Sequence, residues 1–178
     1  VIAGALEALR PFPGRTQVLP GVHNSKLLDD TYNATPTSVQ AALSVLTSLP
    51  APLRIAVIGS MNELGDFSME AHKSIGASLD PSDVDLVVAI GHDAGTYLAP
   101  AAEANGCTVK TFHNPRKAGE FVKGQLKDGA VVLVKGSQNG VFSEEALKVL
   151  LRNPEDSMKL VRQSPYWMKR KRRLLASK

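Results

Sequence analysis

The sequence has little cysteine, few aromatic residues and no long apolar run. Its 178 residues include a single cysteine, Cys107, which excludes an internal disulfide and a cysteine-rich metal site. No apolar run approaches the roughly 20 residues that a membrane-spanning helix needs, so we expect no membrane partner. The first ten residues lack the basic leader and the apolar stretch of a signal peptide, and we therefore expect a cytoplasmic protein.

An initiator Met is also missing, so we expect the chain to be a fragment of a longer protein. Its length suits one domain of roughly 100–200 residues. We assign residues 1–15 to the end of a preceding domain and a linker, because the proline-rich stretch 11–15 follows a short helix-like segment. Residues 16–157 are assigned to one domain and residues 158–178 to a basic tail.

Positive charge is concentrated at one end of the chain. The net charge is +4, yet six lysines and arginines lie in the last ten residues, and the remainder is slightly acidic. We therefore do not expect nucleic acid as a partner. Tyr166 and Trp167 beside this basic run fit an RNA-binding arm. They equally fit an apolar anchor on the domain that is followed by a solvated end, which is the interpretation we favour.

Strand-like and helix-like segments alternate along the domain, and the central strands are continuously apolar. This pattern is typical of an α/β fold: a Rossmann-like, mostly parallel sheet with helices on both faces. Two short stretches around Pro20-Gly21 predict a hairpin or two edge strands. The expected strands cover 16–19, 26–28, 53–58, 84–90, 108–112 and 130–134, and the expected helices cover 37–49, 68–79, 94–105, 115–126 and 143–151.

The first chemically suggestive motif is the stretch 29–36, Asp-Asp-Thr-Tyr-Asn-Ala-Thr-Pro, at the end of an apolar strand. In open α/β sheets, ligands bind beyond the carboxyl ends of strands. There Asp30 would accept hydrogen bonds from ribose hydroxyls, and Tyr32 and Asn33 would flank a planar base. The other interpretation is a turn followed by a helix cap at Thr35 or Thr37, the latter with Gln40 three residues on.

Two further glycine-bounded loops carry polar groups. In residues 59–65, Glu63 is placed to receive an ammonium group or a hydroxyl-rich ligand, whereas His72 on the next helix is expected to be a satisfied, half-buried residue. In residues 134–140, Lys135 and Ser137 reach the same sheet edge, where Lys suits a carboxylate or a phosphate. The spacing of a P-loop is absent from the whole chain, so each loop also fits a purely structural role.

The order of these blocks resembles one family. Phe-Pro-Gly-Arg at 12–15, the stretch 29–36, Gly-Ser-Met-Asn-Glu-Leu-Gly at 59–65 and Val-Lys-Gly-Ser at 134–137 follow one another as in the C-terminal domain of the Mur ligases. The member they resemble adds D-alanyl-D-alanine (D-Ala-D-Ala) to UDP-N-acetylmuramoyl-tripeptide (UDP-MurNAc-tripeptide). The resemblance covers about residues 11–151.

The resemblance implies a mechanism and a division of labour. ATP phosphorylates the tripeptide carboxylate, and the amine of D-Ala-D-Ala attacks the acyl phosphate. Magnesium offsets the phosphate charge. The missing N-terminal and central domains would hold the UDP-sugar, the P-loop and the metal ligands, so this fragment would be inactive alone. By matching motif, Arg15, Asp30, Tyr32 and Asn33 would bind ATP, and the D-Ala-D-Ala side would be lined by Glu63, Lys135 and Ser137.

Three positions depart from the family pattern, which often has Asn, Asp and Arg where this chain has Thr35, Ser60 and Gln138. The last two leave the amine substrate open, so a related ligase with another amine remains an alternative. A second alternative is a stand-alone nucleotide-binding or scaffold module that acts in trans with a separate catalytic subunit.

Overall fold

The structure is a computed structural model that describes residues 12–175. The helix expected within residues 1–10 lies outside the described residues. A six-stranded sheet forms the centre, in the order β1-β2-β6-β3-β4-β5, and all neighbouring strands are parallel except the β1–β2 hairpin. The strands are β1 (Gln17–Pro20), β2 (Lys26–Asp30), β3 (Arg54–Gly59), β4 (Leu86–Ile90), β5 (Val109–Phe112) and β6 (Val131–Lys135).

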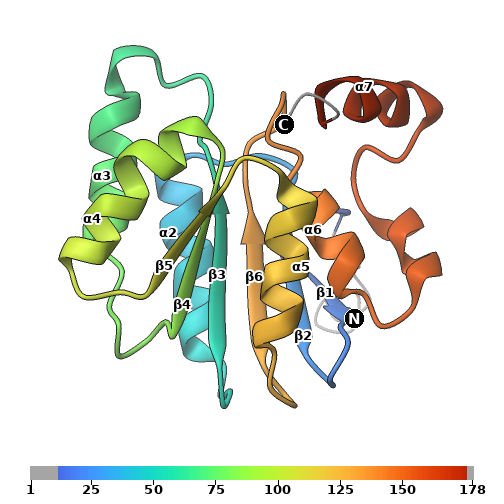
Figure 1. Ribbon diagram of the computed structural model, residues 1–178, viewed down its shortest axis with the longest axis horizontal. Coiled ribbons are helices and arrows are strands. Elements are labelled where there is room, and N and C mark those ends of the chain that lie inside the picture. Colours follow the sequence, from blue (N-terminus) through green and yellow to red (C-terminus); the bar gives the residue numbers. More distant parts are fainter. Residues whose placement is uncertain (1–11, 176–178) are drawn as a thin grey trace, which may run out of the picture.

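Helices cover both faces of the sheet, which confirms the predicted α/β class (Figure 1). α2 to α4 pack on one face, and α5 and α6 pack on the other. The helical elements are α2 (Pro36–Ser48), η1 (Gly65–Phe67), α3 (Ser68–Ala77), η2 (Ala94–Leu98), α4 (Ala99–Ala104), α5 (Pro115–Gln125), α6 (Glu144–Leu150), η3 (Pro154–Lys159) and α7 (Pro165–Leu175).

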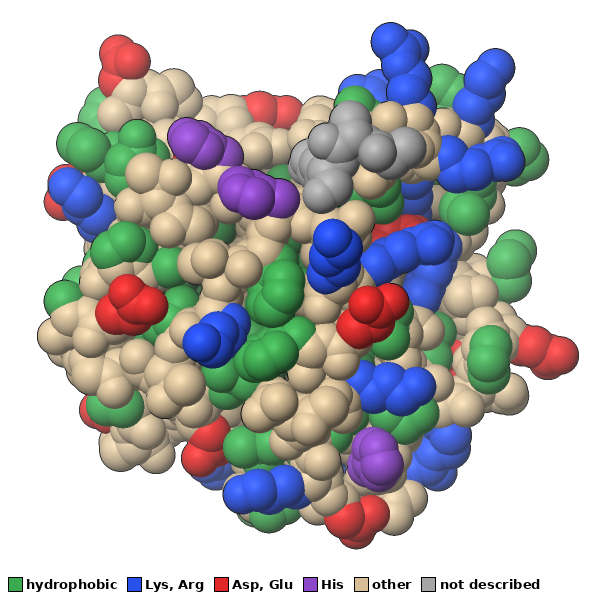
Figure 2. Space-filling model, viewed as in Figure 1, with side chains coloured by type: hydrophobic (Ala, Val, Ile, Leu, Met, Phe, Trp, Pro, Cys, Tyr) green, Lys and Arg blue, Asp and Glu red, His purple; other side chains and the backbone are tan. Residues whose placement is uncertain are grey.

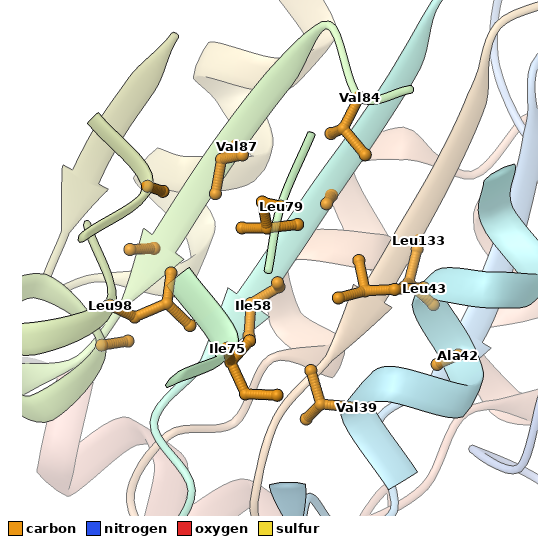
Figure 3. Packing of buried hydrophobic residues seen from close by; sticks show 14 of the residues in the cluster. Val39, Ala42, Leu43, Ile58, Ile75, Leu79, Val84, Val87, Leu98 and Leu133 are labelled. Carbon is orange, nitrogen blue, oxygen red and sulfur yellow. The ribbon is translucent and has the colours of Figure 1, made fainter. Parts of the chain in front are cut away.

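The continuously apolar strands are explained by two separate cores. Successive side chains of a strand point to opposite faces, so Val57 and Ile58 of β3 belong to different clusters. Figure 3 shows Ile58 packed among Val39 and Leu43 of α2 and Ile75 of α3. A strand with a helical layer on each side has no solvent face, and for that reason it shows no polar alternation.

Two local predictions need correction. The helix expected over 94–105 begins as one π-helical turn, η2, before α4 continues it. The helix α2 is capped by Thr35, whose hydroxyl accepts the Ser38 N–H at 3.3 Å while the Ser38 hydroxyl accepts the Thr35 N–H at 2.9 Å. Of the two cap candidates Thr35 is therefore correct, and the expected box of Thr37 with Gln40 is wrong, because Pro36 already occupies the first helical turn.

The segment that contains α7 packs on the domain, unlike a solvated tail. Trp167 of α7 packs edge-on against Phe142 with ring centroids 6.3 Å apart, so the expected apolar anchor is confirmed. The expectation that the basic run is solvated is wrong for Lys171, which is 2% exposed and paired with two glutamates of α6. Other lysines and arginines do gather on the outer side of α7 (Figure 2).

Candidate functional site

A hollow of about 430 Å³ opens beside α2, at the carboxyl ends of β2 and β6. We call it the first hollow. Five of the seven residues singled out in the sequence line it, from three separate stretches of chain. These are Arg15, Asp30, Tyr32, Asn33 and Lys135; the other lining residues include Gly14, Thr16, Thr35, Ser38, Ala41 and Val45.

Asp30 and Lys135 form the charged centre of this hollow. They are direct partners in the parallel pairing of β2 with β6, and because each ends its strand their side chains meet. The Lys135 Nζ lies 2.5 Å from Asp30 Oδ2 and donates to the Asn33 carbonyl at 3.1 Å. The other carboxylate oxygen of Asp30 accepts the Thr16 N–H at 3.0 Å. Lys135 is almost fully buried, whereas Asp30 remains 14% exposed and thus within reach of a ligand.

Arg15 and Tyr32 form the outer wall of the first hollow. The Arg15 guanidinium lies 4.3 Å from the centroid of the Tyr32 ring, a cation–π contact between two exposed side chains. One face of the ring is therefore occupied. A planar base that stacks on this face has to displace Arg15, which frees the guanidinium for a ligand phosphate.

Ser137 and Glu63 do not line this hollow. Ser137 is buried, donates to the Ala34 carbonyl at 3.1 Å and accepts the Asn62 N–H at 2.9 Å. It ties together the loops that follow β3 and β6. Glu63 is exposed in the first of these loops, with a left-handed φ of 66°. Lys135, which the resemblance places on the D-Ala-D-Ala side, lies with Asp30, so the expected substrate group is not brought together in this domain.

A second hollow, of about 230 Å³, lies beyond the carboxyl ends of β3 and β4. Its exposed histidines, His92 and His113, were not singled out in the sequence, because each stands alone outside any block of motif. Asn62 lines this hollow and donates to the Gln138 and Asn139 carbonyls at 2.7 and 3.0 Å. The second hollow is thus separated from the first by the tied loops.

The loop after β3 is fixed from within. His72, expected to be half-buried, is fully buried: its Nε2 accepts the Met61 N–H at 2.9 Å, and its Nδ1 lies 2.7 Å from the Ser68 carbonyl. Ser60 accepts the Ala94 N–H at 3.1 Å. His72 is therefore a positioned structural residue, as expected, and Ser60 links the loops after β3 and β4.

A network of buried charges lies behind the first hollow, at the start of α6. Glu144 and Glu145 are fully buried and pair with four cations from α5, α6, α7 and the segment before α7. Burial would raise the pKa of Glu145, but hydrogen bonds from Lys148 and Lys171 lower it to about 2. We call this group the ion cluster: Glu144, Glu145, Arg116, Lys148, Arg162 and Lys171.

Within residues 12–175, no helix is long and apolar enough to cross a membrane. The same part of the chain gathers no group of three or more His, Cys, Asp or Glu side chains placed to hold a metal ion.

Comparison with known proteins identifies the family. A model described as Mur ligase, glutamate ligase domain, matches residues 14–138. The UDP-N-acetylmuramoyl-tripeptide--D-alanyl-D-alanine ligase of Synechocystis is 33% identical over 128 residues, covering 72% of this chain and 28% of that protein. The ligase of the same name from Bacillus subtilis is 30% identical over 155 residues, covering 85% and 34%.

Solved structures agree. MurF ligase from Thermotoga maritima in complex with ADP is 30% identical with a TM-score of 0.64, covering 80% of this chain and 31% of that one. MurF from Acinetobacter baumannii is 29% identical with a TM-score of 0.70, covering 82% and 32%. The chain thus spans about a third of the length of these relatives. The chain belongs to the Mur ligase family, and its matched region corresponds to the glutamate ligase domain.

Proposed function

We propose that this chain is the C-terminal part of an ATP-dependent ligase that joins D-Ala-D-Ala to UDP-MurNAc-tripeptide through an acyl phosphate. The relatives named for this activity support the proposal. The observation that carries it is the first hollow, where Arg15, Asp30, Tyr32 and Asn33 line one cavity although their motifs are separated along the chain. On this proposal the protein works in the cytoplasm.

The geometry supports a division of labour within the first hollow. The exposed part of the Asp30 carboxylate accepts hydrogen bonds from the ribose hydroxyls, while Lys135 holds the carboxylate in place. The base lies against Tyr32 and Asn33, and the displaced Arg15 reaches the phosphates. The MurF ligase from Thermotoga maritima was solved in complex with ADP, which supports a nucleotide as a ligand of the longer protein.

The remaining parts of the reaction lie outside these residues. The second hollow is open, polar and separated from the first, and these properties suit the incoming dipeptide. Glu63 is exposed in the loop after β3, next to Asn62, which lines this hollow. The P-loop, the magnesium ligands and the UDP-sugar site belong, on this proposal, to the preceding domains of the longer protein. Closure of this domain over them brings the amine to the acyl phosphate and excludes water.

The proposal is tested with the longer protein that contains this chain. Phosphate release is measured with ATP, UDP-MurNAc-tripeptide and D-Ala-D-Ala, and each substrate is omitted in turn. We expect release that requires all three, and none from residues 12–175 alone. Asp30→Asn should raise the KM for ATP roughly tenfold or more, because a hydrogen bond to a charged group contributes about 1.5–3 kcal/mol.

Asp156→Asn is the matched control. It also removes a carboxylate paired with a lysine, Lys159 at 2.7 Å, but Asp156 does not line the first hollow. Its KM for ATP should stay at the wild-type value. Release that continues without the dipeptide, or an equal KM for ATP in Asp30→Asn and wild type, would contradict the proposal.

A further inference from the structure

Arg162 reaches from the C-terminal segment to the back of the first hollow. Its side chain is 6% exposed, and its guanidinium pairs with Glu144 through Nη2 at 2.6 Å and Nε at 2.9 Å. The same group donates to two backbone carbonyls, those of Thr31 at 2.5 Å and Tyr32 at 3.1 Å. A planar fork of five N–H donors makes this arrangement possible, because it can serve a carboxylate and carbonyls at once.

The two carbonyls belong to the stretch that forms the wall of the first hollow. The Tyr32 N–H donates to the Gly14 carbonyl at 2.9 Å, so this contact joins the Arg15 segment to the Tyr32 segment. Val161 packs directly against Gly14, because a Cβ added at Gly14 would lie only 2.7 Å from the Val161 Cγ1. Residues 161 and 162 therefore pack against both stretches that carry Arg15 and Tyr32.

Arg162 is itself firmly held. It adopts a left-handed φ of 57°, an uncommon conformation for a residue with a Cβ, which surrounding contacts have to maintain. Glu144 supplies one such contact and also accepts Lys171 of α7 at 2.7 Å. The helix α7 is thus connected through one buried carboxylate to the wall of the first hollow.

Glu144, Arg162 and Lys171 lie beyond the part of the chain that the family model matches, which ends at residue 138. When the backbone that lines a site is already held in its bound conformation, less free energy is lost in ordering it as the ligand binds. We propose that Arg162 is a positioning residue for the nucleotide hollow, and that the C-terminal segment acts on ATP binding through it. This inference rests on the proposed function.

The test uses the full-length ligase and two substitutions of this residue. Arg162→Lys keeps a cation against Glu144, so the ion cluster retains its charge balance, but an ammonium lacks the fork that reaches both carbonyls. We expect the KM for ATP and the Kd for ADP to rise about three- to tenfold, as for the loss of one or two hydrogen bonds. The KM values for tripeptide and D-Ala-D-Ala should stay within about twofold. Arg162→Gln should raise the KM for ATP at least as much.

Arg152→Gln is the matched control. Arg152 is an arginine of the same C-terminal segment that also bonds a carbonyl and a side-chain oxygen, at Gly21 and Asn24, away from the first hollow. Its KM for ATP should equal that of wild type. If Arg162→Lys changes only the melting temperature or kcat, and leaves the KM for ATP at the Arg152→Gln value, the inference is overturned. If wild type itself shows no ATP-dependent ligation, the proposed function fails instead.

Discussion

The first hollow and the ion cluster use the same chemistry in two different ways. In the hollow, Asp30 and Lys135 pair at 2.5 Å, but the carboxylate keeps an exposed side. In the ion cluster, Glu144 and Glu145 are fully buried and are surrounded by cations from four parts of the chain. A charged group that is to meet a ligand keeps a side open, whereas one that holds elements together has every side occupied.

From this comparison we expect the largest loss of stability when a carboxylate of the ion cluster is replaced. Glu144→Gln leaves Arg162 and Lys171 buried without their shared carboxylate. Removing one partner of a buried pair costs about 3–5 kcal/mol. We expect a loss of that size in the free energy of unfolding, measured by urea denaturation. Glu155→Gln, at an exposed position, should change the value by less than about 0.5 kcal/mol. An equal loss in both variants would remove the distinction.

Asp29 sits between the two regions, and its removal should stabilise the fold. Burial raises its pKa to about 6 despite hydrogen bonds from Thr31, and Glu144 adds repulsion. The folded chain therefore binds this proton more tightly than the unfolded chain. The stability of the wild type falls on this account as the pH rises from about 4 to 6, and the penalty then stays constant.

Asp29→Asn keeps an oxygen for the two Thr31 donors and cannot titrate. We expect it to gain about 1–3 kcal/mol of unfolding free energy at pH 8, and the gain should vanish near pH 4. Urea denaturation at pH 4, 5, 6 and 8 measures the difference. A gain that is the same at every pH would show that charge burial is not its cause.

The smallest effect is expected at the open wall of the first hollow. Tyr32→Leu removes the cation–π contact with Arg15 but keeps an apolar side chain. Tyr32 is 44% exposed, so the free energy of unfolding should fall by less than about 1 kcal/mol, while the KM for ATP of the full-length ligase rises. Phe67→Leu, at a more exposed ring outside the hollow, serves as the control for both measurements. A stability loss near that of Glu144→Gln would contradict the comparison.

The sequence was sufficient for the layers of the fold but not for the neighbours of each strand. Continuous apolar runs and helical spacing are local signals, and the elements they predict are present. Asp30 and Lys135 are 105 positions apart, and their contact depends on β6 returning beside β2. No local pattern contains that information. The assignment of Lys135 to the D-Ala-D-Ala side came from the matching family motif alone, which does not say which strand lies beside β6.

The C-terminal segment shows the same limit more strongly. A run of lysines and arginines is usually solvated, and nothing in its composition indicates that Lys171 finds two buried glutamates at the start of α6. Arg162 likewise has no motif around it. The adjacent glutamates gave no signal either, because acids in the first turn of a helix are favoured by the helix dipole whether or not they are buried.

The hydrogen bonds of Ser137 have a consequence for inhibitor design. Ser137 joins the Ala34 carbonyl, beside the first hollow, to the Asn62 N–H, beside the second. The crevice at the topological switch between β3 and β6, where open α/β sheets usually take a ligand, is therefore filled by the chain's own loops. A compound that binds both hollows at once has to pass over the loops that Ser137 ties together. A flexible linker that follows the protein surface is therefore a better design than a rigid one that crosses the space between the strands.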